Sequence, residues 1–435
     1  MFPLKSILFL SLFSVGCFGS IFFHPMIGVI TYVLDYNISP ANHWWGLPLT
    51  EMGIQWSKIA SISIALGMVI HHKKLNFGKF LYFQEILLII FVALIWGSQF
   101  WGLPQGELTT SNALKMTKIA FFILMLTHIV TTKKRFELLI WTLIILAFYL
   151  GFSAYTAPSW AFKAGRLDIG VGGPDFMEGN FLGAHFAMVL PFIGVMFLKE
   201  KWWTKILCLV VMAFCVNAII LTRSRGVLLG CAMGVLTALT LGTLFMKGKR
   251  TKIISWVTLG IIGAFLLTDK GFWTRMVTLK KTNFKTQNID ASAMGRIWAW
   301  EASLKMFKKY PMGIGEGNFK NYVGYFDDRI PGKDTHSTYL RCLAELGILG
   351  IFVLFLMIIN GFWMLIKIWN LAKTKELYDY RWYVFATAIG LVVFLTCGAF
   401  ITETYVEEFY WLLFFPVVLL RSIVNEQKES SEQIL

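Results

Sequence analysis

Residues 205–226, KILCLVVMAFCVNAIILTRSRG, decide the fold of this chain. After Lys205 the run to residue 221 holds a single polar side chain, Asn217, and is long enough to cross the hydrocarbon layer of a bilayer as a helix. The residues Arg223, Ser224 and Arg225 follow, and a second apolar run begins immediately. A backbone in lipid has to satisfy its hydrogen bonds internally, so this pattern predicts two membrane helices joined by a very short turn.

The same pattern recurs along the whole chain, which is 57% hydrophobic and only 15% charged. It predicts an all-α fold, a polytopic integral membrane bundle of about 12 helices. The expected spans lie near residues 52–70, 80–97, 113–130, 137–155, 181–198, 205–221, 226–246, 253–270, 346–368, 382–402 and 404–421. Residues 5–36 form one broken span or a tight hairpin, because His24-Pro25 interrupts them. We count them as one crossing, which gives twelve.

Basic residues in short loops predict the orientation of the bundle. Bases cluster at 71–74, 133–135, 199–205, 247–252 and 367–381, in alternate loops that we expect to be cytoplasmic. With twelve crossings both termini are also cytoplasmic. The loops near 37–50, 98–112, 156–180, 222–225 and 271–345 then face outward. The formal net charge of +15 does not indicate a nucleic-acid partner, because the bases are dispersed among apolar spans.

Four regions follow from this pattern: an N-terminal bundle (1–270), a large outer loop (271–345), C-terminal membrane helices (346–421) and a cytoplasmic tail (422–435). The outer loop carries 12 Lys or Arg against 7 Asp or Glu. Within it Ile297, Trp300, Leu304 and Phe307 recur at helical spacing, and Pro311 ends the pattern. We expect an amphipathic helix that lies along the membrane face or packs over the bundle.

His336 is the first candidate for chemistry, because it lies among hydroxyl side chains at the end of the outer loop. A neutral imidazole can accept a proton from an attacking hydroxyl group at physiological pH. The alternative interpretation is an ordinary residue at the start of a helix. The other histidines lack this polar setting or lie in a basic turn, and are weaker candidates.

Arginines on the expected outer face form a second group of candidates. Arg223 and Arg225 lie where short outer loops normally avoid bases, and two guanidinium groups can bind a diphosphate in a bidentate manner. Snorkelling to lipid headgroups is the alternative. Arg166 lies in a glycine-rich outer loop, and Arg296 could contact a lipid phosphate or an anionic substrate. No spacing of Cys, His or acidic residues predicts a metal site.

The order of several short motifs resembles the O-antigen ligase and polymerase superfamily of bacterial envelopes. The motifs are Arg-Ser-Arg-Gly between two spans, Ser-Ala-x-Gly-Arg-Ile-x-x-Trp from Ser292, Pro-x-Gly-x-Gly from Pro311, His-Ser-x-Tyr-Leu from His336 and Glu-x-Gly-x-x-Gly from Glu345. The chain looks closest to the O-glycosylation ligases that are associated with exosortase systems. In terms of motifs the resemblance covers about residues 160–370.

The resemblance implies a metal-independent membrane glycosyltransferase without a cofactor. Such an enzyme moves a glycan from an undecaprenyl-diphosphate carrier to an acceptor hydroxyl of lipid A core, polysaccharide or protein. It implies that His336 acts as the base or orients the acceptor. It also implies that Arg166 and one of Arg223 and Arg225 hold the diphosphate. Arg296, Tyr339 and Glu345, which lie within the motifs or directly after them, complete the expected substrate-binding residues.

The resemblance also implies a bacterial inner-membrane location with the site facing the periplasm. A polymerase of glycan repeat units, from the same superfamily, is an alternative. A transporter of lipid-linked glycan is a weaker alternative, because the spans carry few ionisable residues at the membrane midplane. A structural scaffold would leave the Arg-Ser-Arg turn unexplained. The sequence specifies neither the sugar, the acceptor, the stereochemical outcome nor the oligomeric state.

Overall fold

The computed structural model describes residues 3–75, 78–109, 112–163, 165–168, 171–199, 201–277, 291–372 and 377–432. These residues form helices, with one short antiparallel ribbon in which Phe162 pairs with Leu167. The α-helices are α1 (Leu4–Phe22), α2 (Pro25–Ile38), α3 (Leu47–Glu51), α4 (Trp56–Ile70), α5 (Phe83–Trp101), α6 (Ala113–Ile129), α7 (Lys133–Tyr155), α8 (Gly179–Lys199), α9 (Trp202–Thr222), α10 (Arg225–Phe245), α11 (Arg250–Leu267), α12 (Lys270–Val277), α13 (Ala291–Lys309), α14 (Phe319–Phe326), α15 (Thr338–Leu371), α16 (Asp379–Gly398) and α17 (Glu407–Glu432). The ribbon strands are β1 (Phe162–Lys163) and β2 (Arg166–Leu167), and the short 3₁₀ helices are η1 (Pro40–Asn42), η2 (His72–Lys74), η3 (Ser159–Ala161), η4 (Pro174–Phe176) and η5 (Lys247–Lys249).

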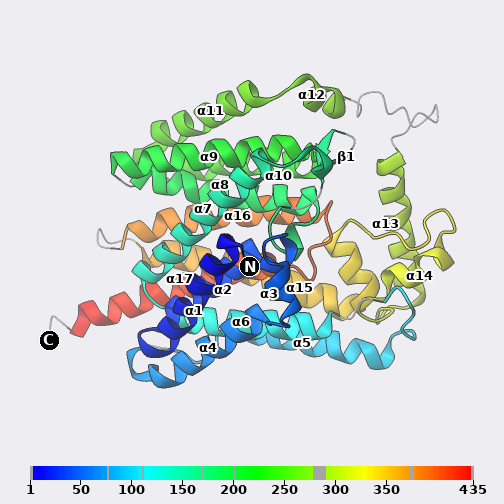
Figure 1. The fold of residues 1–435 in the computed structure, drawn as a ribbon, viewed down its shortest axis with the longest axis horizontal. Coiled ribbons are helices and arrows are strands. Elements are labelled where there is room, and N and C mark those ends of the chain that lie inside the picture. The colour runs from blue at the N-terminus through cyan, green and yellow to red at the C-terminus, as the bar shows by residue number, and fades with distance from the viewer. Residues whose placement is uncertain are drawn as a thin grey trace.

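The predicted class, an all-α polytopic membrane bundle, is confirmed. In the described part of the chain, nine helices are long and apolar enough to span a membrane. This is fewer than the twelve expected spans, partly because α2, α4 and α6 contain only 14, 15 and 17 residues. Helix α17 lies in the core, and its residues 409–420 are all buried. Helix α11 lies at the periphery, and only 6% of its apolar stretch is buried (Figure 1).

Contacts between turns place the expected outer loops at one end of the bundle, which we call the loop end. There, Tyr36 and Lys115 both contact Asp175 at 2.8 Å. The amide of Leu103 donates to the carbonyl of Ile314, within the long loop, at 2.8 Å. Turns that are well separated in sequence therefore meet at this end, as the alternation of basic loops predicts.

The expected cytoplasmic turns meet at the opposite end. Lys133 and Lys199 approach the same carboxylate, Asp379, at 3.4 and 3.5 Å. The imidazole of His71 contacts the carbonyl of Ile21 at 3.0 Å. The bundle therefore has two chemically distinct ends, with the basic turns gathered at one of them.

The N-terminal region is a helical hairpin, so our count of a single crossing for residues 5–36 is wrong. Helices α1 and α2 pack against each other and both contact α4. The chain reverses at His24, whose ring accepts a hydrogen bond from the amide of Met26 and caps α2. Ser6, at the start of α1, donates to the carbonyl of Trp45, so α1 begins at the loop end. Asn425 contacts the carbonyl of Thr131 at the opposite end. The first and last helices of the described chain therefore have their outer termini at opposite ends of the bundle.

The long loop folds over the loop end of the bundle, where α13 runs across the direction of the bundle helices (Figure 1). Helix α13 packs on α14 and α15. A helix therefore forms at the predicted position, but the stripe that it buries differs from the predicted apolar stripe. Ala299, Ala302 and Met306 are fully buried, whereas Leu304 is 49% exposed. The buried face therefore consists of two alanines and a methionine rather than of the predicted larger apolar residues. Residues 278–290 of the loop lie outside the described residues.

Helix α15 begins at Thr338, eight residues before the expected span, and its axis breaks at Gly347. Gly347 has φ 64° and ψ −157°, a conformation that is essentially restricted to glycine. The preceding turn fills the break, because the amide of Ile314 donates to Ala344 and the amide of Ile348 donates to Pro311, both at 2.9 Å. The glycine-rich segment after Pro311 is thus a tight turn, and it fixes the first part of α15 at the loop end.

Candidate functional site

His336 lies immediately before α15 in a left-handed backbone conformation, with φ 48°. Neighbouring groups hold this strained turn. The hydroxyl of Thr335 donates to the carbonyl of Ser337 at 3.1 Å, and the indole of Trp300 donates to the carbonyl of Thr335 at 3.1 Å. Ser337 caps α15. Strained backbone of this kind is concentrated at functional sites, where the surrounding structure maintains it.

The half-buried imidazole of His336 lines a cavity of about 230 Å³ at the loop end. The walls come from the start of α6, from η4 and the start of α8, from the long loop and from the turn before α17. The other lining residues are Asn112, Lys115, Asp175, Glu178, Phe181, Asp334, Arg341, Thr402, Tyr405 and Val406. Most of them are polar, so the cavity suits a hydrogen-bonding ligand.

A buried ion-pair network supports the cavity wall beside His336. The guanidinium of Arg341, only 5% exposed, contacts both carboxylate oxygens of Asp334 at 3.0 and 3.1 Å. It also contacts Glu345 at 2.9 Å, and Lys320 lies 3.3 Å from Asp334. Burial alone would raise the pKa of Asp334, but Arg341, Lys320 and His336 lower it well below its ordinary value. Asp334 is therefore a fixed negative charge two residues before His336.

The environment of His336 favours its neutral form. Burial lowers the pKa of the imidazole, and the positive charge of Arg296 lowers it further. Lys320 and Lys333 act in the same direction, while Asp334 opposes them. A neutral ring at physiological pH is the form that can accept a proton.

Replacing Arg296 with glutamine should move the acid limb of the pH–activity profile to higher pH. Loss of the positive charge raises the pKa of His336, so the ring becomes protonated, and inactive as a base, at a higher pH than in the wild type. The measurement is the transfer rate as a function of pH. Lys308→Gln, on the exposed side of the same helix, is the control and should leave the limb in place. An acid limb at the same pH in R296Q and in the wild type would contradict an effect of Arg296 on the pKa of His336.

The Arg-Ser-Arg turn joins α9 to α10 at the loop end. Arg223 ends α9 in the left-handed conformation, with φ 47°, and its guanidinium contacts Asp269 at 2.7 Å. Glycines leave space for this group, because a Cβ atom would lie 2.9 Å from it at Gly165 and 2.5 Å from it at Gly271. Arg225 donates to the carbonyl at position 275 at 3.2 Å.

Arg166 lies on strand β2, beside the start of α8. Its guanidinium contacts Asp168 at 2.8 Å and Asn180 at 3.5 Å. Both partners are close in sequence, so the glycine-rich loop forms a local support for this arginine.

The structure brings the predicted arginines to the same end as His336, but it does not place Arg166, Arg223, Arg225 or Arg296 in the lining of the cavity. A packed path joins the two parts of the site. Gly226, in the Arg-Ser-Arg-Gly turn, lies against Phe400, whose ring is 6.2 Å from that of Trp300, and Trp300 contacts Thr335. Arg296 is close enough to affect the pKa of His336. The candidate site therefore consists of a cavity at His336 and an adjacent group of arginines.

Tyr339 and Glu345 also lie outside the cavity lining. The hydroxyl of Tyr339 donates to the carbonyl of Leu395 at 2.6 Å, and its ring stacks on Phe355. Glu345 is fully buried and accepts hydrogen bonds from Arg341 and from Tyr405. Both residues therefore hold the first turns of α15 in place.

Sequence reasoning did not identify several residues of the cavity. Asp334 lies two residues before the His336 motif, and this position was an available signal. The pairing of Arg341 with Glu345, four residues apart on a helix, is the local pattern expected for such charges. Lys115, Asp175 and Glu178 come from other elements, and no local pattern connects them with His336.

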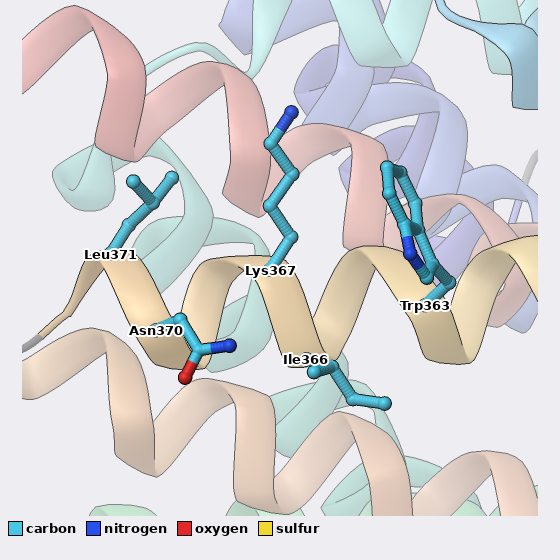
Figure 2. A pocket seen from close by; sticks show the side chains of 5 residues that line it. All are labelled: Trp363, Ile366, Lys367, Asn370 and Leu371. Atoms are coloured by element: carbon cyan, nitrogen blue, oxygen red, sulfur yellow. The ribbon is translucent and has the colours of Figure 1, made fainter.

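A second and larger recess, of about 410 Å³, lies near the far end of α15 (Figure 2). It is lined by Trp363, Ile366, Lys367, Asn370 and Leu371, all from that helix. In Figure 2, Trp363 and Lys367 project from one side of the helix and Ile366 from another. The recess contains none of the predicted site residues, so its size does not make it the candidate site.

The comparison with protein families finds a similarity in the central part of the chain. Residues 207–355 match the family model described as O-antigen ligase. This segment begins in α9, contains the Arg-Ser-Arg turn and the long loop, and ends in α15. It includes His336, Arg223, Arg225 and Arg296, while Arg166 precedes it. The match to the O-antigen ligase family does not distinguish the exosortase-associated subgroup. No curated protein matches the chain.

Proposed function

We propose that this protein transfers a glycan from an undecaprenyl-diphosphate carrier to an acceptor hydroxyl group. The observation that carries the proposal is the position of His336, which belongs to the segment that matches the O-antigen ligase family and lines a polar cavity. The nearby arginines supply the positive charge that a diphosphate donor requires. The exosortase-associated subgroup, the bacterial inner-membrane location and a loop end that faces the periplasm are parts of the same proposal.

In the proposed reaction, the acceptor oxygen attacks the anomeric carbon of the donor and a new C–O bond forms. The bond from that carbon to the diphosphate breaks, and its electron pair leaves with the carrier diphosphate. Nε2 or Nδ1 of His336 accepts the proton of the acceptor hydroxyl, or the ring orients that group. Arg223 or Arg225, with Arg166 and Arg296, stabilises the charge that develops on the leaving group, a task that needs no metal ion.

The ion pair between Arg223 and Asp269 bears on how a donor would bind. The side chain of Asp269 is 59% exposed, and it is paired with the Arg223 guanidinium that we propose binds the diphosphate. Exposed ion pairs are worth only about 0–1 kcal/mol. A diphosphate carries more negative charge than one carboxylate, so it can displace Asp269 at little cost.

A strain that lacks this protein tests the proposal. We expect the glycan-loaded carrier to accumulate and the joined product to disappear, and we expect a plasmid copy of the wild-type chain to restore both. Lipid and glycan profiling by mass spectrometry measures these changes. A single joined product supports a ligase, whereas a ladder of repeat units would identify a polymerase. Unchanged carrier and product levels would contradict glycan transfer of either kind.

A further inference from the structure

The carboxylates that line the cavity differ in their partners. Asp175 is paired with Lys115, and Asp334 with Arg341 and Lys320. The positive charges of the wall are thus already balanced by carboxylates of the protein.

Glu178, directly before α8, is the exception among the lining carboxylates. No ion pair between described residues includes it. Desolvation raises its pKa, the negative charges of Asp334 and Asp168 raise it further, and the positive charges of Lys320 and Arg166 oppose them. Glu178 is exposed and forms no ion pair among the described residues, so its carboxylate can accept hydrogen bonds from neutral donors such as hydroxyl groups.

The charge pattern separates two kinds of ligand group. An anionic group in the cavity would meet the carboxylates of Asp175, Glu178 and Asp334, and Arg341 is held by buried acidic partners. The diphosphate of a donor therefore belongs with the arginines outside the cavity. At about 230 Å³ the cavity is smaller than typical ligand pockets of roughly 300–1,000 Å³, so it suits one small polar unit.

We propose that the cavity binds an uncharged, hydroxyl-rich unit of the acceptor, such as one neutral sugar ring, and that Glu178 positions it by accepting hydrogen bonds. This inference rests on the proposed function and adds the chemical class of the acceptor. Glu178 and Asp334 accept hydrogen bonds from ring hydroxyls, and Phe181 and Val406 supply the apolar part of the cavity lining. An acceptor unit that carries a carboxylate or phosphate binds more weakly, because Asp175, Glu178 and Asp334 repel it.

The first experiment measures equilibrium binding and does not depend on turnover. Purified full-length protein in lipid nanodiscs is titrated calorimetrically with methyl glucoside, which is neutral, and with glucuronate, which is anionic. We expect the wild type to bind the glucoside and to bind glucuronate at least 10-fold more weakly. Glu178→Gln should weaken glucoside binding and reduce this difference. Equal binding of both probes, or no binding of the glucoside, would overturn the inference.

The second experiment measures transfer kinetics with the carrier-linked donor at saturation. Glu178→Gln should raise the acceptor KM by about 10- to 100-fold, the usual effect of losing a hydrogen bond to a charged group, while kcat and the donor KM stay nearly constant. The matched control is Glu107→Gln, an exposed carboxylate of another loop at the same end, which should change nothing. Thermal unfolding of each variant checks its fold, and Glu178→Asp, which keeps the charge, should recover part of the affinity.

The two experiments separate the two proposals. Sugar binding that depends on Glu178, without any transfer, would keep the cavity assignment and contradict glycan transfer. Transfer that is abolished by loss of His336 but is insensitive to Glu178 would support glycan transfer and overturn the role of Glu178.

Discussion

Replacing His336 with asparagine should reduce the rate of glycan transfer by about 10²- to 10⁴-fold, the usual contribution of a positioned general base. Asparagine is the informative substitution because it tolerates the left-handed backbone conformation that residue 336 adopts. Alanine would add backbone strain at φ 48°, so a loss of the base could not be distinguished from a loss of the local structure. The measurement is initial transfer velocity from a carrier-linked donor, with thermal unfolding recorded for the same samples.

The matched control is His72→Asn, an exposed histidine at the opposite end of the bundle. It should keep wild-type activity. An H336N protein that unfolds at the wild-type temperature and transfers at the wild-type rate would contradict a role of His336 as base. A rise in acceptor KM with unchanged kcat would instead assign it to acceptor orientation.

Replacing Gly347 with alanine should destabilise the protein by several kcal/mol. The backbone conformation at this position costs about 1–3 kcal/mol for a residue with a side chain. A Cβ atom would also lie 2.3 Å from the carbonyl oxygen of Pro311, so the turn that fills the break in α15 has to move. The first turns of α15 carry Arg341 and Glu345, so the wall of the cavity should be lost with the turn.

The thermal unfolding temperature in detergent measures this effect, and Gly260→Ala on α11 is its control. A Cβ atom added at Gly260 would meet no described residue within 4 Å, and alanine is a better helix former than glycine by about 1 kcal/mol. The control should therefore be neutral or slightly stabilising. A G347A protein that is as stable as the wild type would show that the break in α15 tolerates a side chain.

The class of fold was predictable because it depends on local chemistry. Each apolar run has to become a helix in lipid, and the alternation of basic turns then decides which loops share an end. The N-terminal hairpin was not settled by these rules. His24-Pro25 indicates an interruption, but the reversal depends on how α1 and α2 pack against α4. The start of α15 was misplaced because its first turns are polar and belong to the site rather than to an apolar span.

The candidate site was predictable only in part. The motifs identified His336 and the arginines, and the pattern of basic turns placed all of them in loops on the same side of the membrane. The division of this face into a polar cavity and a separate arginine group depends on tertiary contacts. Glu178 and Asp175 line the same cavity as His336 only because the segment before α8 and the segment before α15 come together at the loop end, and the buried face of α13 follows from its neighbours rather than from its own apolar stripe.

The start of α1 at the loop end makes the two ends of the chain unequal for protein production. If this end faces the periplasm, cargo fused ahead of α1 has to be threaded through the membrane before the hairpin can form. Under the same condition, cargo fused after α17 stays in the cytoplasm. An affinity tag or folded reporter therefore belongs behind α17, whereas a periplasmic reporter placed ahead of α1 would reveal the sidedness of the bundle directly.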